Sequence, residues 1–173
     1  VIGVDLKQIV SGLKAFKPCP GRMELCVIPE DIVVLDDSYN ANPLSVHAAL
    51  DALHDLNSAG RRIAVLADML ELGPTGPELH HHIGTLAAER VDWLFTYGAL
   101  AEEIARGAVE GGLPVAQVLT AQSHDELAAS LLEVLQEGDR VLVKGSRGMR
   151  MEKVIDALRI ARQKTALNGN GKG

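Results

Sequence analysis

The sequence predicts an α/β domain with a mostly parallel sheet of about six strands and helices on both faces. Two observations lead to this class. Short apolar runs alternate along the chain with amphipathic stretches, which is typical of repeated strand–helix units. Hydrophobic residues make up 47% of the 173 residues and aromatic residues only 3%, so one substantial core can form from aliphatic side chains. We therefore expect a Rossmann-like, three-layer domain.

Residues 1–20 are predicted to be the end of a preceding domain together with a linker. A helical pattern follows a potential cap at Asp5 and stops before Pro18 and Pro20. The apolar positions of this pattern are Leu6, Ile9, Val10 and Leu13. A helix this close to the first residue, followed by a proline-containing linker, is typical of the last element of another domain. A helix that belongs to this domain is the alternative.

The domain itself is predicted to begin with a β-hairpin. Met23–Ile28 and Ile32–Leu35 are short apolar runs, and the segment Pro29–Asp31 between them favours a turn. A helix is expected next, because apolar residues recur three and four positions apart until Gly60 ends the pattern. These helical positions are Val46, Ala49, Leu50 and Leu53. The continuous apolar run Ile63–Ala67 then predicts a buried strand.

The alternation continues along the rest of the chain. The further predicted elements are a helix carrying Leu79, Ile83, Leu86 and Ala87, a strand at Trp93–Thr96, a helix at Ala99–Glu110, a strand at Val115–Leu119, a helix from Ser123 to Leu135, a strand at Val141–Lys144, and a helix lined by Met151, Val154, Ile155 and Leu158. Ser123 and Glu126 form a capping-box pattern, and Gly111, Gly112 and Gly138 are expected to end helices. Residues 163–173 are predicted to be a flexible tail, so the domain spans residues 21–162.

Charge and composition exclude several classes of protein. Lys and Arg number 17 and Asp and Glu 23, which gives a net charge of −6 and argues against binding to a nucleic-acid backbone. No apolar run is long enough to span a membrane, and the first residues lack the order of a signal peptide. Cys19 and Cys26 are too few for a disulfide framework and do not have CxxC spacing. We expect a cytoplasmic protein with reduced thiols.

Three loops that follow predicted strands have unusual compositions, and ligands of parallel α/β sheets bind at such loops. The first, Asp36–Pro43, contains two carboxylates, a phenol and two amides, among them Asp37, Tyr39, Asn40 and Asn42. A carboxylate at a strand end can accept the hydroxyls of a ribose, and an amide can pair with a base edge. Asp, Asn and Pro also form turns and helix caps, which is the competing interpretation.

The second loop, Ala67–Gly73, places Asp68 at a strand end, where it could serve a ligand, orient another group or cap a helix. The three histidines 80–82 that follow do not indicate a metal site. Consecutive helical residues point about 100° apart and cannot all reach one ion. We expect a solvated face with one packed histidine.

The third loop, Lys144–Arg150, combines glycine, a hydroxyl and three basic side chains before a predicted helix. Backbone amides and a guanidinium suit a carboxylate or a phosphate, so this loop predicts an anion site. The pattern G-x-x-x-x-G-K-[ST] occurs nowhere in the sequence, and neither does G-x-G-x-x-G. A self-contained P-loop enzyme and a dinucleotide dehydrogenase are therefore not supported.

Taken together, these loops resemble the C-terminal part of the Mur ligases. The resemblance rests on Val33–Pro43, on Asp68–Gly73 with His80 and Gly84, and on Leu142–Glu152. It covers about residues 3–160, and Pro20–Glu24 is similar to the family's link between its central and C-terminal domains. The most similar members are those that add D-alanyl-D-alanine to a UDP-N-acetylmuramoyl-tripeptide.

The resemblance implies the third domain of an ATP-dependent ligase of peptidoglycan synthesis. In such a ligase ATP phosphorylates the peptide carboxylate, and the amine of the dipeptide attacks the acyl phosphate. The P-loop, the Mg²⁺ ligands and a carbamylated lysine belong to the central domain, so this chain alone is expected to be inactive and to supply no catalytic or metal-binding residue.

The same resemblance assigns site residues to this chain. It implies ATP binding by Arg22, Asp37, Tyr39, Asn40 and Asn42. By position, it implies binding of the acceptor dipeptide by Lys144, Gly145, Ser146 and Arg147. Asp68 and His80 are expected to support the site.

Two alternatives stay open at this stage. One is a related Mur ligase that adds a single amino acid, against which the segments Tyr39–Asn42 and Lys144–Arg147 argue. The other is a stand-alone Rossmann-like binding module without ligase activity. An upstream G-x-x-x-x-G-K-[ST] in the same reading frame would favour a ligase, and its absence would favour the module.

Overall fold

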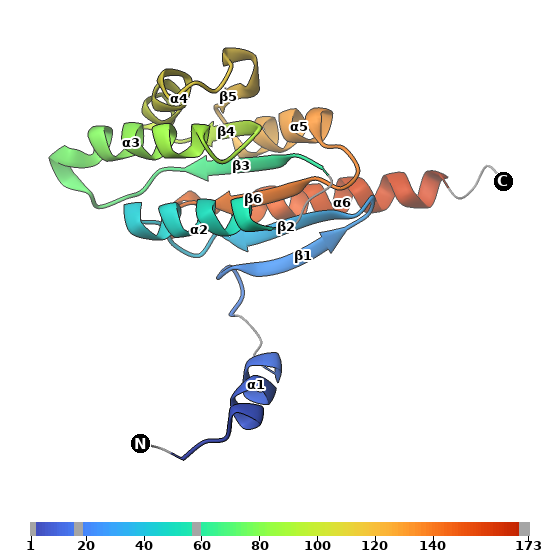
Figure 1. Cartoon of the computed structure of the whole chain (residues 1–173). Coiled ribbons are helices and arrows are strands. Elements are labelled where there is room, and N and C mark those ends of the chain that lie inside the picture. Colours follow the sequence, from blue (N-terminus) through green and yellow to red (C-terminus); the bar gives the residue numbers. More distant parts are fainter. Residues whose placement is uncertain (1–2, 16–18, 57–59, 170–173) are drawn as a thin grey trace.

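The computed structural model describes residues 3–15, 19–56 and 60–169, which form one six-stranded sheet flanked by helices (Figure 1). The strands are β1 (Glu24–Ile28), β2 (Ile32–Asp37), β3 (Arg62–Ala67), β4 (Trp93–Tyr97), β5 (Val118–Ala121) and β6 (Arg140–Lys144). The α-helices are α1 (Leu6–Ala15), α2 (Pro43–Asp55), α3 (Gly76–Ala88), α4 (Ala101–Glu110), α5 (His124–Val134) and α6 (Glu152–Gly169). Three short 3₁₀ helices are η1 (Gly73–Thr75), η2 (Val115–Gln117) and η3 (Arg147–Met149).

The strand order is β1-β2-β6-β3-β4-β5, and only the pairing of β1 with β2 is antiparallel. The predicted fold class and the N-terminal hairpin are therefore confirmed. The hairpin turn places Glu30 and Asp31 at positive φ angles of 72° and 52°. Because β6 inserts between β2 and β3, the loops after these three parallel strands are neighbours at the carboxyl end of the sheet.

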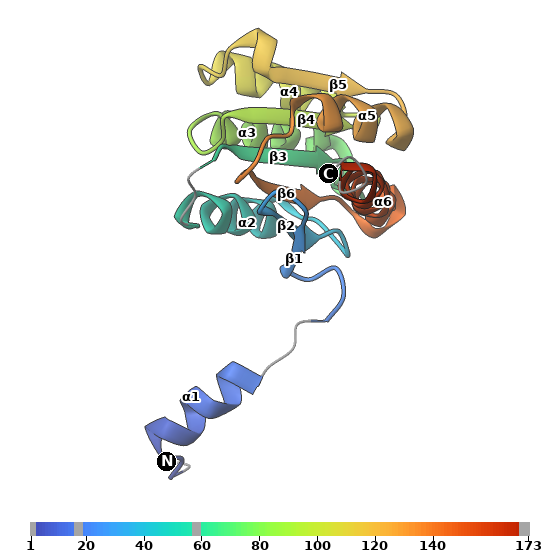
Figure 2. The same ribbon diagram turned by 90° about the vertical axis from the view of Figure 1, so that its right-hand side faces the viewer.

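Helices cover both faces of the sheet, with α2, α3 and α4 on one side and α5 and α6 on the other (Figure 2). Side chains of β3 alternate between these two layers, as expected for a strand buried on both faces. Ile63 and Val65 join the cluster under α5 and α6, whereas Ala64 and Leu66 join the one under α2, α3 and α4. Aliphatic residues dominate both clusters.

The edge strand β5 differs from its prediction. The strand begins at Val118, where pairing with Leu94 of β4 starts, and Val115–Gln117 forms the 3₁₀ turn instead. Val115 is apolar but 70% exposed, so it is not part of the core of this chain. An apolar run predicts where a strand can form, but pairing with the neighbouring strand decides where it does form.

A helix lies at or near each end of the described chain. Residues 163–169, expected in the flexible tail, continue α6 to Gly169, and residues 170–173 lie outside the described residues. Helix α1 contains no buried residue and lies away from the sheet in both views. The assignment of residues 1–20 to a preceding domain stays a prediction. Within the described ranges, no helix has both the length and the apolar character needed to cross a bilayer.

Candidate nucleotide and acceptor site

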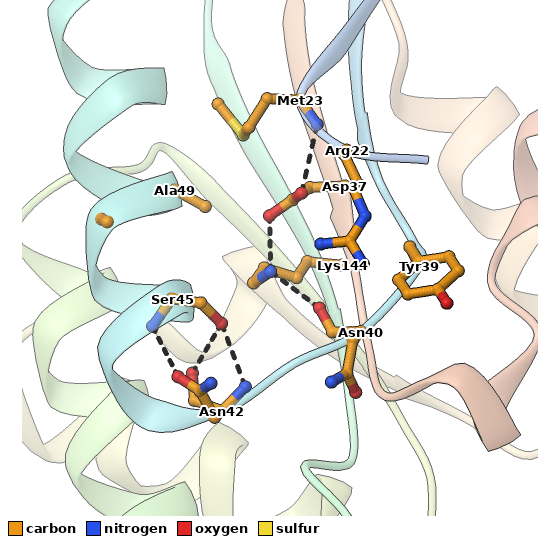
Figure 3. A pocket seen from close by; sticks show the side chains of 10 residues that line it. Arg22, Met23, Asp37, Tyr39, Asn40, Asn42, Ser45, Ala49 and Lys144 are labelled. Carbon is orange, nitrogen blue, oxygen red and sulfur yellow. Dashed lines mark hydrogen bonds and ion pairs between the residues drawn. The ribbon is translucent and has the colours of Figure 1, made fainter. Parts of the chain in front are cut away.

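A cavity of about 370 Å³ opens at the carboxyl end of β2 (Figure 3). Its lining comes from the segment before β1, the loop after β2, the first turns of α2 and the end of β6. The lining residues are Arg22, Met23, Asp37, Tyr39, Asn40, Asn42, Ser45, Ala48, Ala49 and Lys144. All five residues predicted to bind ATP therefore line one cavity, which we call the first cavity.

A buried ion pair forms part of the lining of the first cavity. Asp37 and Lys144 are register partners at the ends of β2 and β6, so their side chains meet. The Lys144 ammonium donates to the Asp37 carboxylate at 2.5 Å and to the Asn40 carbonyl at 2.9 Å. The other Asp37 oxygen accepts the Met23 amide at 3.1 Å. The Lys144 side chain is only 2% exposed, so its positive charge lies inside the protein and is compensated by the Asp37 carboxylate.

Arg22 and Tyr39 form the more exposed wall. The Arg22 guanidinium lies 4.1 Å from the centre of the Tyr39 ring, a cation–π contact, and Figure 3 shows it between Asp37 and Tyr39. Gly21 makes this approach possible, since it adopts a φ of +70° and its carbonyl accepts the Tyr39 amide at 2.9 Å. The result is a fixed aromatic platform beside a free positive charge, which suits a nucleotide.

The two asparagines of this loop have different roles. Asn42 caps α2, because its side-chain oxygen accepts the Ser45 amide at 2.8 Å and the Ser45 hydroxyl oxygen accepts the Asn42 amide at 3.0 Å. The capping interpretation is thus correct for Asn42. Among the described residues, the Asn40 carboxamide has no hydrogen-bond partner and borders the cavity, so it can bind a ligand.

Asp68 joins the loops after β3, β4 and β6. Its carboxylate accepts the Ala99 amide at 2.7 Å and the Leu100 amide at 3.0 Å, and its carbonyl accepts the Ser146 amide at 3.0 Å. Asp68 is 4% exposed. Gly98, at a φ of +127°, makes room for it, because a Cβ there would collide with the carboxylate. These bonds also explain why α4 begins at Ala101 and not at the predicted Ala99.

His80 anchors the same loop from α3. Its Nε2 accepts the Met69 amide at 2.8 Å, so the proton resides on Nδ1, which donates to the Gly76 carbonyl at 2.7 Å. His80 is fully buried, whereas His81 pairs with Glu110 at 2.9 Å and His82 is exposed. One of the three histidines is therefore packed, as predicted. The described part of the chain contains no group of three or more His, Cys, Asp or Glu placed to hold a metal ion.

A second cavity, of about 300 Å³, lies between the loops after β2, β3 and β6. We call it the second cavity. It is lined by Asn40, Ala41, Asn42, Leu70, Glu71, Ser146, Arg147 and Gly148. Because Asn40 and Asn42 line both cavities, two ligands bound in them would lie side by side.

The residues predicted to bind the acceptor separate in the structure. Ser146 and Arg147 line the second cavity, whereas Lys144 lines the first. Gly145 lines neither; a Cβ at this position would lie 2.8 Å from the Ala67 Cβ, so the missing side chain lets β6 pack against β3. Ser146 is 4% exposed, and its hydroxyl oxygen accepts the Leu70 amide at 2.8 Å and donates to the Ala41 carbonyl at 3.3 Å.

Arg147 is the most available of these groups. Its side chain is 62% exposed, lies 3.4 Å from the Glu152 carboxylate and 5.9 Å from the centre of the Tyr39 ring. Glu71, which faces the same cavity, was not among the predicted site residues. Its backbone φ of +66° is rare for glutamate and has no clear signature in the sequence.

Fold and site together define an α/β domain with two adjacent polar cavities at the carboxyl ends of parallel strands. The chain matches the model of the family "Mur ligase, glutamate ligase domain" over residues 21–147 and belongs to this family. The resemblance seen in the sequence is thus confirmed.

Relatives within this family are named as D-alanyl-D-alanine ligases. The chain is 32% identical over 157 residues to the UDP-N-acetylmuramoyl-tripeptide–D-alanyl-D-alanine ligase of Bacillus subtilis, which covers 90% of this chain and 34% of the relative. It is 34% identical over 160 residues to the enzyme of the same name from Escherichia coli, and this match covers 91% of this chain and 33% of the relative. The chain therefore spans about a third of the length of the curated relatives it matches.

Solved structures agree with these relatives. The structure of MurF ligase from Thermotoga maritima in complex with ADP superimposes with a TM-score of 0.76 at 26% identity, over 94% of this chain and 35% of that one. A MurF structure from Acinetobacter baumannii gives a TM-score of 0.78 at 30% identity, over 92% and 35%. The similarity thus extends across nearly all of this chain and about a third of each relative.

Proposed function

We propose that the chain is the C-terminal, nucleotide- and acceptor-binding domain of an ATP-dependent ligase that joins D-alanyl-D-alanine to a UDP-N-acetylmuramoyl-tripeptide. The observation that carries this proposal is the first cavity, where residues of a Mur ligase domain place a guanidinium, an aromatic ring and a free carboxamide together. The relatives named for this reaction, one of them with ADP bound, support it.

The chain's own residues supply binding and orientation in this proposal. Asp37 and Asn40 offer oxygen and amide groups to the ribose and base, and Arg22 offers its guanidinium to the phosphates. Tyr39 provides the surface on which these groups are held. Asn42 contributes indirectly, since it fixes the start of α2. The Mg²⁺ that accompanies ATP is expected to be held outside this chain, as the family resemblance implies.

Catalysis then requires closure of this domain onto the P-loop domain of the same enzyme. Closure would bring the amine of the acceptor to the acyl phosphate formed on the tripeptide, and it would exclude water from that intermediate. The domain alone should not turn over. We propose a cytoplasmic location for the enzyme, because ATP and nucleotide-linked precursors occur there.

Kinetics of the full-length enzyme test the first cavity as the nucleotide site. The substitution Arg22→Ala removes a charge-assisted contact, so it should raise the KM for ATP roughly 10- to 100-fold. The KM for the dipeptide should stay within about 2-fold of the native value. Arg159→Ala is the matched control, because Arg159 is a partly exposed arginine that bonds Cys26 on the α6 side of the sheet. An Arg22→Ala enzyme with an unchanged KM for ATP would contradict the assignment.

A further inference from the structure

The second cavity carries one charge of each sign. The acidic residue Glu71 lines it from the loop after β3, and the basic residue Arg147 lines it from the turn after β6. Within the described residues, the Glu71 side chain has no hydrogen-bond or ion-pair partner. In the same described part of the chain, Arg147 pairs with Glu152 at 3.4 Å and lies 5.9 Å from the centre of the Tyr39 ring, which leaves most of its donors free.

Two buried side chains hold the loop that presents Glu71. The Met69 amide is bonded to His80 of α3, and the next amide, that of Leu70, is bonded to the Ser146 hydroxyl oxygen. The Leu70 side chain also packs on the turn after β6, where a Cβ at Gly148 would lie 2.8 Å from its Cδ1. The loop is therefore fixed immediately before Glu71.

The backbone of Glu71 is strained in this fixed loop. Its φ of +66° lies in the left-handed region, which glycine and asparagine adopt far more readily than glutamate. Such strain persists where surrounding contacts impose it, and it concentrates at functional sites. The strained residue lines a cavity that Arg147 also lines, and its carboxylate has no partner among the described residues.

These charges select the class of ligand. A nucleotide polyphosphate would meet repulsion from Glu71, whereas a short zwitterion can satisfy both groups with its ammonium and its carboxylate. The volume of about 300 Å³ lies at the lower end for ligand cavities and suits a ligand of this size. The shared border at Asn40 and Asn42 would place this ligand beside the nucleotide.

We propose that Glu71 binds the free ammonium group of the acceptor dipeptide while Arg147 binds its carboxylate, so that Glu71 is a specificity-determining residue of the acceptor site. This inference rests on the proposed function for the identity of the ligand. In this role Glu71 selects dipeptides with an unblocked amino terminus, because only a ligand with a free amine pairs with the Glu71 carboxylate.

Equilibrium binding to the full-length enzyme tests this role. With a non-hydrolysable ATP analogue and the UDP-linked tripeptide present, calorimetry compares D-alanyl-D-alanine with N-acetyl-D-alanyl-D-alanine, which lacks the ammonium. Glu71→Gln should weaken binding of the free dipeptide roughly 10- to 150-fold and change binding of the acetylated one less than about 2-fold. Glu71→Asp should restore part of the loss.

A matched variant and a backbone control separate charge from folding. Glu137→Gln makes the same change in an exposed turn before β6 and should alter neither affinity. Glu71→Gly relieves the strain of the positive φ but removes the carboxylate. This variant should melt no lower than the native protein and should still lose affinity for the free dipeptide. Equal losses for both dipeptides, or none for the free one, would overturn the inference.

Turnover distinguishes this inference from the proposed function. Absence of dipeptide-dependent phosphate release by the native enzyme would refute the ligase assignment. Normal phosphate release combined with an unchanged dipeptide affinity in Glu71→Gln would refute the role of Glu71 alone. Failure of the native enzyme to bind the free dipeptide more tightly than the acetylated one would also overturn the inference.

Discussion

Replacement of Asp68 by asparagine should destabilise the domain substantially. The carboxylate is 4% exposed and accepts two backbone amides, from Ala99 and Leu100, at 2.7 and 3.0 Å. Hydrogen bonds to charged groups contribute about 1.5–3 kcal/mol each. Asparagine keeps one acceptor oxygen, but its NH₂ group faces the second amide, so one bond is lost and one partly buried amide is left facing another donor.

The expected cost of Asp68→Asn is therefore about 2–4 kcal/mol of unfolding free energy. For a domain of this size each kcal/mol lowers the melting temperature by about 2–4 °C, which predicts a decrease of roughly 4–16 °C. Urea unfolding followed by circular dichroism, together with a thermal melt, measures both quantities. The same variant should fray the start of α4, which hydrogen exchange at Ala99 and Leu100 can detect.

Asp92→Asn is the matched control for this prediction. Asp92 is exposed and accepts a single backbone amide, that of Arg62 at 2.7 Å, so its loss should cost at most about 1 kcal/mol. Equal stability losses in the two variants, or an Asp68→Asn protein within about 0.5 kcal/mol of the native one, would refute the view that Asp68 joins the loops of the site.

Three further predictions concern ligand binding and the thiols. In the full-length enzyme, Arg147→Ala should lower kcat/KM for the dipeptide roughly 10- to 150-fold with little change for ATP, and equal changes for both substrates would end the carboxylate assignment. The 173-residue chain alone should bind ATP with a Kd above roughly 1 mM, because its sequence lacks a P-loop, and micromolar binding in calorimetry would contradict this. Iodoacetamide should modify exposed Cys19 at least roughly tenfold faster than Cys26, because burial raises the pKa of the Cys26 thiol although Arg159 acts to lower it. Equal modification rates in peptide mass spectrometry would disprove this.

The sequence predicts the fold well because its signals are local. The apolar run Ile63–Ala67 and the helical pattern of α2 each show their burial within one segment, and both elements form as predicted. Strand β5 was displaced because its extent depends on pairing with β4 rather than on its own composition. Periodicity measures whether a segment can be buried, and not which neighbour buries it.

The site was predictable only in part, for the same physical reason. The three loops could be identified from their composition and their place after strands. The pairing of Asp37 with Lys144 could not be, because these residues are 107 positions apart and meet only once β6 inserts beside β2. The division of Lys144 and Arg147 between two cavities, and the strained backbone of Glu71, likewise depend on contacts between distant segments.

One assay tests most directly the claim that this domain serves a dipeptide-adding ligase: ATP-dependent phosphate release by the full-length enzyme with UDP-N-acetylmuramoyl-tripeptide as the donor. D-alanyl-D-alanine is compared with D-alanine, L-lysine and D-glutamate as acceptors, each over a range of concentrations. The account predicts saturable phosphate release with the dipeptide and a kcat/KM at least roughly 100-fold lower for each single amino acid. Comparable release with a single amino acid, or none with the dipeptide, would contradict it.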